Sequence, residues 1–479
     1  MDHDYLRFYA GGEFHQSNSP VRLAIINPAT EEHLADVSDC DAGDTEKAVA
    51  QAVSARISWA ALPNRERGLL IGQLGQLIRR DLDEIAELEC RDIGRTLNEC
   101  RAHVLRAAET CEYCAGYADK LEGRLIPQKQ GTFAYTLVEP YGVVGAITPW
   151  NPALLHIIQK TSHALTTGNV IVIKLSPLAC LSAYKLTELI EEAGFPPGVF
   201  NFVTGTVDAG NALITHPKID LVSFTGSASV GYTVAGVAGT HGKPIHLELG
   251  GKAPAIIFAD SDLDSAALDL ASATFGSTGQ SCTAPTRIFV ERPVFEEFTA
   301  HFTNYGSAYK GRDPFSPDAK MGPLISQDAR QRVLNLVEDA VNNGAKIVHG
   351  ALDQHLSDKG YFLDPMILSE VTDSARIFHE EVFGPVTCLY PFDDETEVID
   401  RANSGPSGLA AGLYTESLTR TRRLVNNLRV GNVWINGYKK LDPALPFGGI
   451  KGSGFSRECG VDGLLAFTTP KAVVESFSN

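Results

Sequence analysis

Apolar residues recur at helical spacing through much of the first 120 residues. The segment 41–62 (DAGDTEKAVAQAVSARISWAAL) has this period, with Asp41 and Asp44 in position to cap its first turn. Before it, residues 22–28 (RLAIINP) form an apolar run that ends in a proline-containing turn, which predicts a short β ribbon. Further helical runs are predicted at about 64–92 and 97–119.

Short apolar runs that end in turns alternate with helical segments from residue 132 onward. Strand-like sequence at 132–147 is followed by VIVIK (170–174) and LVSF (221–224), and each of these two runs precedes a helix-like segment. Strands that alternate with helices predict a doubly wound parallel sheet. A second alternation, and therefore a second α/β unit, is predicted from residue 254 through 288–300, 333–349, 385–391 and 421–435.

Length, composition and charge narrow the class of protein. The 479 residues suggest about three units at roughly 150 residues each. The formal charge of −17 argues against unaided binding of nucleic acid or anionic lipid. No apolar run approaches the ~18 residues of a membrane-spanning helix, and the charged start, MDHDYLRFYA, lacks the apolar core of a signal peptide. We therefore expect a cytoplasmic protein with neither a nucleic-acid nor a membrane partner.

The nine cysteines are an odd number without a framework, which suits free thiols in a reducing compartment. Cys111 and Cys114 form C-x-x-C within a helical run. A zinc site needs two more ligands at fixed spacing, and a thioredoxin-like motif begins a helix after a strand. Neither context is present in the sequence, so two partly buried helix cysteines are the favoured interpretation and no metal site is predicted.

Three features offer candidate chemistry on local sequence alone. Cys282 lies in FGSTGQSCTAPTR, where small residues leave its sulfur accessible, although most free cysteines are structural. Glu248 ends a strand before two glycines, an odd place for a solvated charge, although a surface Glu near a turn is the simpler interpretation. Residues 224–231 (FTGSASVG) join a strand to a helix, as a pyrophosphate-binding turn does, but lack the G-x-G-x-x-G and Walker patterns.

Seven motifs, taken in order, resemble the aldehyde dehydrogenase superfamily. They are TPWN (148–151), VIVIK (170–174), FTGSASVG (224–231), LELGGK (247–252), GQSC (279–282), EEVFGPV (380–386) and PFGGIKGSG (446–454). The resemblance runs from about residue 20 to the C-terminus, and LELGGK and GQSC are its specific motifs. The 34 residues from Glu248 to Cys282 also resemble the family spacing. The resemblance implies NAD(P)-dependent oxidation of an aldehyde to a carboxylic acid.

The resemblance also implies roles for five catalytic residues. Cys282 would attack the aldehyde and form a thiohemiacetal, with its oxyanion held by the Asn151 side-chain amide and the Cys282 backbone N–H. Hydride transfer then leaves a thioester, and Glu248 would activate the water that hydrolyses it. Members that pass the acyl group to coenzyme A typically lack this glutamate, so a free acid is the expected product. Lys160 and Glu458 match positions of a proton relay to the general base, although without the resemblance both would be interpreted as surface charges.

A cofactor crevice follows from the same resemblance. Lys174 would contact the adenosine ribose, Ser227 the pyrophosphate and Glu381 the nicotinamide ribose. Further cofactor contacts are expected from Trp150, Ser176, Gly226, Gly231, Leu249 and Phe383. Many members carry Glu three residues after the strand lysine, where this chain has Pro177, and the loss of that carboxylate removes one barrier to a 2′-phosphate. We expect NAD as the first cofactor and NADP as the second candidate.

The predicted substrate is a small aldehyde, bound in a tunnel between the helix after TPWN and a loop before PFGG. The positions that line this tunnel are less aromatic than in members acting on apolar aldehydes: Pro152, His156, Gln159, Leu441, Asp442 and Pro443, with Ser281 and Thr283 beside the nucleophile. Arg106, Lys439 and Lys440 offer positive charge for an acidic aldehyde, although a solvated surface position is the simpler interpretation of each.

The expected fold class is α/β with three parts. A Rossmann-like cofactor domain spans 1–119 and 141–250, an α/β catalytic domain spans 251–464, and a small β oligomerisation element combines 120–140 with 465–479. In the family such a ribbon extends a neighbour's sheet, which implies a homodimer or homotetramer.

Two alternative functions are considered for the same fold. A cysteine acyl-hydrolase would need no nicotinamide, and the strand–turn–helix unit argues against it. A non-catalytic binding protein on the same fold would not need Cys282, Glu248 and Asn151 together.

Overall fold

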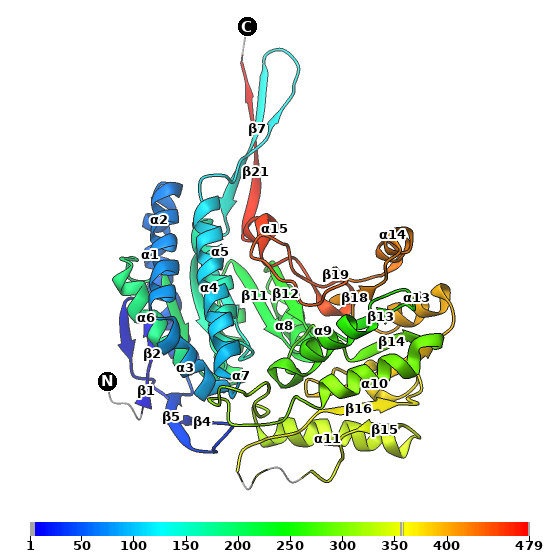
Figure 1. Ribbon diagram of the computed structural model, residues 1–479. Helices are drawn as coiled ribbons and strands as arrows, with labels where there is room; N and C mark the ends of the chain where they lie inside the picture. Colours follow the sequence, from blue (N-terminus) through cyan, green and yellow to red (C-terminus); the bar gives the residue numbers. More distant parts are fainter. Residues whose placement is uncertain (1–4, 355–356, 358, 478–479) are drawn as a thin grey trace.

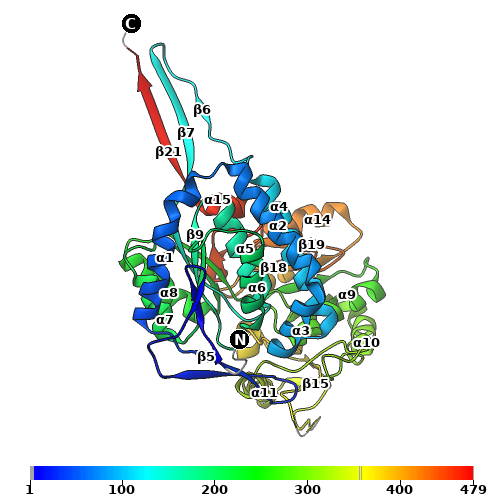
Figure 2. The ribbon, with the colours of Figure 1, turned by 90° about the vertical axis from the view of Figure 1, so that its left-hand side faces the viewer.

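The computed structural model describes residues 5–354, 357 and 359–477. Two large sheets, each with helices on both faces, form two lobes, and a narrow arm projects away from both (Figures 1 and 2). This is the α/β architecture that the alternation of strands and helices predicts. Residues 1–4 and 478–479, the two ends of the predicted domain ranges, lie outside the described residues.

The first lobe is built on an eight-stranded sheet of order β20-β12-β11-β8-β9-β10-β2-β3. Its five central strands are parallel, and β20, β2 and β3 add antiparallel edges. The strands are β2 (Phe8–Ala10), β3 (Glu13–His15), β8 (Val143–Ile147), β9 (Val170–Lys174), β10 (Phe200–Val203), β11 (Leu221–Gly226), β12 (Ile245–Leu249) and β20 (Gly454–Phe455). The central strands are buried nearly throughout, as strands covered on both faces must be.

Helices cover both faces of this sheet, as Figure 2 shows. On one side lie α1 (Ala42–Ala61), α7 (Val207–Thr215) and α8 (Ala228–Thr240); on the other lie α5 (Ala153–Thr166) and α6 (Leu181–Glu192). The helices α2 (Asn64–Arg80), α3 (Leu82–Ile93) and α4 (Leu97–Tyr117) pack outside α5 and α6. Asp41 and Asp44 form the capping box of α1, as their spacing predicts.

The second lobe is built on a seven-stranded sheet of order β15-β16-β17-β14-β13-β18-β19, parallel except at β15. Its strands are β13 (Pro254–Ile257), β14 (Arg287–Glu291), β15 (Lys346–His349), β16 (Met366–Ser369), β17 (Val386–Phe392), β18 (Ala410–Tyr414) and β19 (Asn432–Ile435). One apolar core contains α9 (Leu263–Phe275) and α10 (Phe295–Gly306). The opposite core contains α11 (Gln327–Asn342), α12 (Arg376–His379), α13 (Glu395–Asn403) and α14 (Leu418–Asn427).

The arm is a three-stranded antiparallel sheet of order β21-β7-β6. It pairs β7 (Thr132–Pro140) with β21 (Thr468–Ser476) on one side and with β6 (Leu125–Ile126) on the other. The helix α15 (Gly460–Ala466) leads into β21. A second small sheet joins β1 (Tyr5–Leu6), β4 (Arg22–Ile26) and β5 (His33–Ser38).

Two details of the sequence-based picture change. The helical run predicted at 64–92 is two helices that meet at Asp81, whose carboxylate binds Arg80 and Lys185 and so holds the chain where α3 turns toward α6. The strand β20 falls within the predicted catalytic range but pairs with β12 of the first lobe. The domain division itself stays a prediction.

Cys111 and Cys114 lie on α4 and are fully buried, more deeply than expected. The sulfur of Cys111 is 3.4 Å from the Ser162 hydroxyl, and that of Cys114 is 3.8 Å from the His163 Nδ1. Within the described ranges, no helix is both long and apolar enough to cross a membrane.

Candidate active site

Cys282 lies in a loop of unusual backbone shape between the 3-10 turn η1 (Gly276–Gly279) and β14. Ser277 and Thr278 both adopt the left-handed region at φ 56°, which costs conformational energy for residues other than glycine. The Glu99 carboxylate accepts the Ser277 N–H at 2.6 Å, and the Thr278 hydroxyl donates to the Gly322 carbonyl at 3.0 Å. These contacts fix the loop that presents the thiol.

Close packing requires a glycine at position 279, the first residue of the GQSC motif. A Cβ at Gly279, which has φ +66°, would lie 2.1 Å from the Gly384 carbonyl oxygen. The small residues around Cys282 therefore have a structural reason as well as a chemical one.

Asn151 and Cys282 line one cavity of about 300 Å³. Asn151 precedes α5, and its Nδ2 donates to the carbonyl of Gln280 at 3.1 Å, two residues before the thiol. Gln280 is itself fully buried and its side-chain oxygen accepts the Ile325 N–H at 2.9 Å. The amide that the resemblance assigns to the oxyanion is thus tied to the nucleophile loop.

Glu248 is a buried carboxylate at the carboxyl end of β12, where it pairs in register with Gly454 of β20. Neither carboxylate oxygen has a hydrogen-bond partner within the described part of the chain. Burial, and then the negative charge of Glu458, raises the pKa of Glu248 well above its usual range. A Cβ at Gly448 would lie 2.5 Å from Glu248 Oε1 and 3.0 Å from the Ser456 carbonyl oxygen, so glycine leaves room for this position of the carboxylate. An unpaired buried carboxylate of this kind is poised to accept a proton.

Lys160 and Glu458 form a buried ion pair close to Glu248. Lys160, only 1% exposed, donates from Nζ to Glu458 Oε1 at 2.7 Å and to the Ser223 hydroxyl at 2.9 Å. Burial acts to raise the pKa of Glu458, but the charge of Lys160 outweighs it and brings the pKa to about 2. The interpretation of these two residues as surface charges is therefore wrong, because the fold encloses both.

Glu458→Gln is expected to shift the acid limb of the kcat–pH profile to lower pH. The glutamine removes a negative charge that raises the pKa of Glu248 and keeps the positive charge of Lys160, which lowers it. The base form of Glu248 then exists at lower pH. Steady-state rates across a pH series measure the shift, with the exposed Glu297→Gln as the matched control. An unmoved limb, or a move toward alkaline pH, would contradict the coupling.

The thiol of Cys282 is partly buried and senses the surrounding carboxylates. Burial first, and then the charges of Glu381 and Glu248, raise its pKa to about 12, while Lys439 lowers it. The Gly251 N–H donates to Glu381 Oε1 at 3.3 Å, and a Cβ at Gly251 would lie 2.5 Å from the Cys282 carbonyl oxygen, so Glu381 and the nucleophile loop lie close together.

The turn from β11 to α8 is shaped for a phosphate group. Gly226 ends β11, and Ser227 precedes the thirteen-residue α8 without capping its N-terminal amides by its side chain. A Cβ at Gly231 would lie 2.2 Å from Leu249 Cδ2, so glycine lets α8 pack closely against β12. Uncapped amides at the start of a helix favour an anion such as pyrophosphate.

Lys174 ends β9, the strand two along from β11 in the sheet, and Ser176 follows it in the next turn. Burial lowers the pKa of Lys174 to about 8, partly offset by the charge of Asp39. The hydroxyl of Ser176 accepts the Leu178 N–H at 3.3 Å. Both residues lie at the carboxyl edge of parallel strands, where open α/β sheets bind ligands.

Glu381, Trp150 and Phe383 are further predicted cofactor contacts. The Glu381 Oε1 accepts the Gly251 N–H at 3.3 Å, and burial raises the pKa of Glu381 to about 7. The rings of Trp150 and Phe383 meet edge to face with centroids 5.8 Å apart. Together with the open amides of α8, this carboxylate and aromatic wall fit the ribose and phosphate groups of a dinucleotide.

The comparison with known proteins decides the family. A sequence model of the aldehyde dehydrogenase family matches residues 14–473. The chain belongs to the aldehyde dehydrogenase family. It is 41% identical to Aldehyde dehydrogenase 1A1 of Gallus gallus, over 98% of this chain and 93% of that one.

Solved structures agree with this assignment. An aldehyde dehydrogenase from Bacillus cereus, described as an NAD+ complex, superposes with a TM-score of 0.97 at 37% identity, covering 99% of this chain and 97% of that one. A structure described as an E. coli NADP dependent enzyme has a TM-score of 0.97 at 32% identity, with 99% and 98% covered.

The predicted α/β fold and nicotinamide-dependent aldehyde oxidation are confirmed, and the substrate of this aldehyde dehydrogenase is an aldehyde. The acyl-hydrolase and non-catalytic alternatives are thereby disfavoured. The roles of individual residues stay predictions.

Sequence reasoning missed two residues of the aldehyde dehydrogenase site. Gln280 connects Asn151 to the nucleophile loop, and Arg95, in the link between α3 and α4, donates from Nη2 to the same carbonyl at 3.2 Å. A charged residue directly after Gly94, between two helical runs, was the available signal for Arg95. The structure also places Arg106, Lys439 and Lys440 on the wall of the Cys282 cavity. Arg106 and Lys439 are half-buried there, whereas Lys440 is exposed, as the solvated-surface interpretation predicts.

Proposed function

We propose that Cys282, Asn151 and Glu248 carry out hydrolytic aldehyde oxidation. The thiolate of Cys282 forms a carbon–sulfur bond with the aldehyde carbon, and the Asn151 Nδ2 and the Cys282 N–H donate to the resulting oxyanion. A bound nicotinamide supplies the acceptor for the hydride that this carbon releases. The observation that supports the proposal is the cavity shared by Asn151 and Cys282 together with the unpartnered carboxylate of Glu248.

The second half of the reaction depends on Glu248. Its carboxylate takes a proton from water as the water oxygen bonds to the thioester carbon, and the carbon–sulfur bond then breaks to restore the thiolate. Lys160 and Glu458 lie beside Glu248 and tune its proton affinity through their charges. The products are a carboxylic acid and a reduced nicotinamide, with one proton released to solvent.

The proposal is tested by the stoichiometry of products. We expect one free acid for each reduced nicotinamide in the absence of coenzyme A, measured by nicotinamide absorbance and by NMR of the acid. A requirement for coenzyme A, or ester hydrolysis without nicotinamide reduction, would overturn it.

For the cofactor we propose a crevice formed by Lys174, Ser176, Gly226, Ser227, Gly231 and Leu249 at the adenosine and phosphate end, with Trp150, Glu381 and Phe383 at the nicotinamide end. We infer NAD as the preferred cofactor and NADP as an accepted second, since Pro177 presents no carboxylate to a 2′-phosphate. The two kcat/KM values measured with one aldehyde test this order, and strict dependence on NADP would reverse it.

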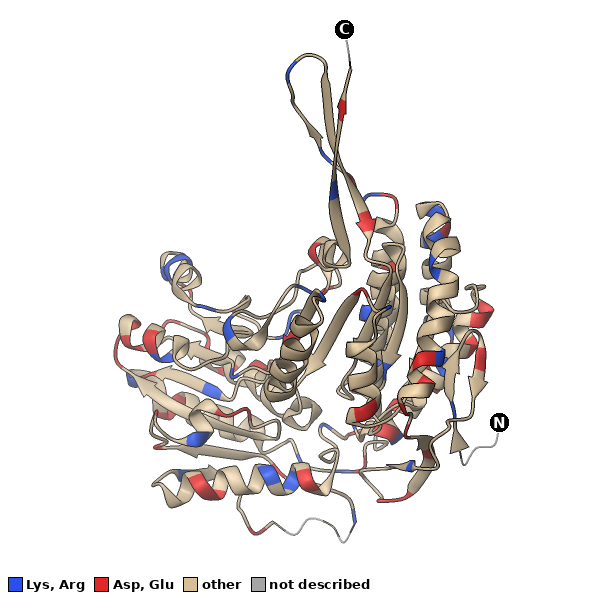
Figure 3. Cartoon of the chain, turned by 180° about the vertical axis from the view of Figure 1, so that it is seen from behind, with Lys and Arg blue, Asp and Glu red and all other residues tan. Residues whose placement is uncertain are grey.

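We propose a homodimer or homotetramer that forms through the arm. Support comes from the arm's unpaired edges and its exposed apolar side chains, among them Leu125 at 68% and Val474 at 65% exposure. Charged residues are sparse on β21, whose sequence TTPKAVVES contains only Lys471 and Glu475, and most of the arm is tan in Figure 3. Sedimentation of the full chain is expected to give the mass of two or four copies.

We also propose the division into a cofactor domain, a catalytic domain and an oligomerisation element, and a cytoplasmic location. The separate apolar cores of the two lobes support the division. The nine unpaired cysteines support a reducing compartment.

A further inference from the structure

The wall of the Cys282 cavity is rich in positive charge although the chain as a whole carries −17. Four permanently or readily charged cations line it: Arg95, Arg106, Lys439 and Lys440. The acidic residues of the same wall are Asp442 and Glu458. Glu458 is already neutralised by Lys160 at 2.7 Å, and an oxygen of Asp442 accepts the Ala444 N–H at 2.8 Å.

These four cations have no carboxylate partners of their own. Among the ion pairs between described residues, none includes Arg95, Arg106, Lys439 or Lys440. Some other buried or half-buried cations, such as Lys160 and Arg401, have such partners, whereas Lys252 and Arg287 have none among the described residues. The cavity therefore holds uncompensated positive charge.

Arg95 is the most enclosed of the four, at 3% exposure. Its Nη1 lies 3.2 Å from a ring nitrogen of His103, its Nη2 donates to the Gln280 carbonyl, and its Nε has no partner in the described chain. Burial lowers the pKa of Arg95, and the charges of nearby groups, with Glu99 first, raise it. No carboxylate pairs directly with this guanidinium in the described chain, and a bound anion would therefore add to its stabilisation.

The neighbouring groups respond to this positive field. Burial lowers the pKa of His103 well below its usual range, and the charges of Arg95, Arg106 and Lys439 lower it further. An uncharged His103 then accepts the hydrogen bond from Arg95. Burial, followed by the charge of Arg95, lowers the pKa of Lys439 to about 8.

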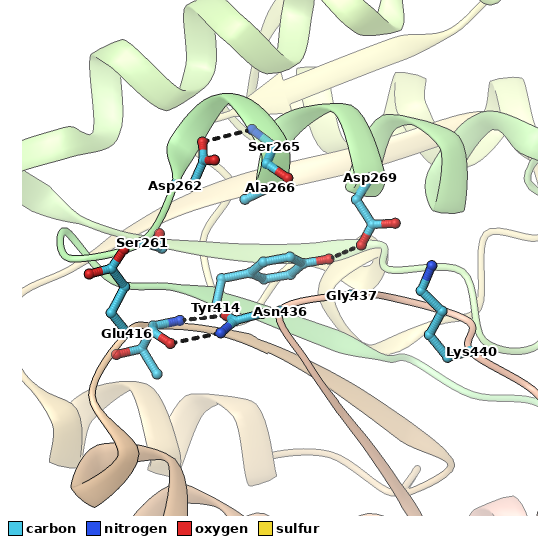
Figure 4. A pocket seen from close by; sticks show the side chains of 11 residues that line it. Ser261, Asp262, Ser265, Ala266, Asp269, Tyr414, Glu416, Asn436, Gly437 and Lys440 are labelled. Carbon is cyan, nitrogen blue, oxygen red and sulfur yellow. Dashed lines mark hydrogen bonds between the residues drawn. The ribbon is translucent and has the colours of Figure 1, made fainter.

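A second cavity beside α9 has the opposite character. Asp262, Asp269 and Glu416 line it, and Asp269 accepts the Tyr414 hydroxyl at 2.6 Å (Figure 4). Lys440 lines both cavities. An anion near Lys440 is therefore repelled by the acidic second cavity and attracted to the cations on the wall of the Cys282 cavity.

We propose that this enzyme selects small aldehydes that carry an anionic group, such as a carboxylate, at the end remote from the carbonyl. Arg106 and Lys440 contact that group. Lys439, whose Nζ donates to the Ala273 carbonyl at 2.7 Å, and Arg95 behind the nucleophile loop add positive charge. The inference rests on the proposed function, because it takes Cys282 as the end at which the carbonyl reacts. A cavity of about 300 Å³ suits a short chain between the two ends.

The test compares 4-oxobutanoate with its methyl ester, which has the same chain and no charge. We expect kcat/KM for the anion to exceed that for the ester at least ten-fold, and to fall as salt rises. Arg106→Gln and Lys440→Gln should each lower kcat/KM about ten-fold for the anion, mainly through KM, and less than two-fold for the ester. The side chains of Arg106 and Lys440 make no ion pair in the described chain, so these substitutions break none. The exposed Arg422→Gln is the matched control.

Each outcome separates the inference from the proposed function. Equal kcat/KM for anion and ester, or equal losses on both in the variants, would overturn the inference while leaving the dehydrogenase intact. If the unmodified protein oxidises neither substrate, the proposed function is overturned instead. 3-Sulfopropanal, which carries a sulfonate in place of the carboxylate, shows which property of the anion is recognised. A kcat/KM equal to that for 4-oxobutanoate supports recognition of charge, and a much lower value supports recognition of carboxylate geometry.

Discussion

Cys282→Ala is expected to reduce aldehyde-dependent nicotinamide reduction by on the order of 10⁴-fold or more, to the background rate. Without the sulfur, no covalent adduct forms, and the groups arranged around it have nothing to stabilise. Alanine fits the partly buried position without adding a polar group, so the fold should be retained. The change in absorbance of the reduced nicotinamide measures the loss.

The chain offers a matched control for this variant in Cys459. Its sulfur lines the same cavity, but Cys459 is more deeply buried than Cys282 and its sulfur accepts a hydrogen bond from Gln159 Nε2 at 3.3 Å. Cys459→Ala should therefore keep the rate within a few-fold. Cofactor binding by Cys282→Ala, measured by calorimetry, should persist. Unchanged turnover in Cys282→Ala, or a loss in Cys459→Ala as large as that in Cys282→Ala, would contradict the assignment of the nucleophile.

Glu248→Gln is expected to separate the two halves of the reaction. The amide has nearly the same shape but cannot take a proton from water, so thioester hydrolysis should slow by ~10²–10⁴-fold. Rapid mixing with aldehyde and cofactor should show a fast burst of one reduced nicotinamide per active site, followed by a slow steady rate. The carboxylate is buried and unpaired in the native protein, so its replacement by a neutral group should not destabilise the fold.

Glu381→Gln provides the contrast, since Glu381 lies on the cofactor side and binds the Gly251 N–H. Loss of the Glu381 carboxylate should reduce the burst of reduced nicotinamide itself. A slow first turnover in Glu248→Gln would show that Glu248 acts before hydride transfer. In the unmodified enzyme the steady rate should rise with pH, because the raised pKa of Glu248 keeps its base form scarce at low pH.

The fold followed from the sequence because its elements depend on local patterns. The runs VIVIK and LVSF are strands because they are apolar and are followed by turn residues, and both lie in one parallel sheet as the alternation predicts. The break at Asp81 was not visible, because it depends on contacts with Lys185, about a hundred residues away. Periodicity alone does not distinguish one long helix from two that meet at an angle.

The site was only partly predictable for the same reason. Local sequence did not favour a catalytic role for Cys282 or Glu248 over a structural or surface role. The order of the seven motifs then supported the catalytic role of both residues. Lys160 looked like a surface charge because its neighbours in sequence do not reveal that Glu458, some three hundred residues later, encloses it. Arg95 has no motif, and its importance comes from where α3 and α4 deliver it, against the carbonyl of Gln280.

The antiparallel pairing of β20 with β12 has a consequence for folding during synthesis on the ribosome. Gly454 and Phe455 emerge only when nearly the whole chain has been made, so the edge of the first sheet beside Glu248 stays open until then. In nascent chains, the β12 edge of this sheet would lack its partner strand for most of translation. A fragment that stops short of this segment should aggregate or be degraded rather than persist as an independent dinucleotide-binding module.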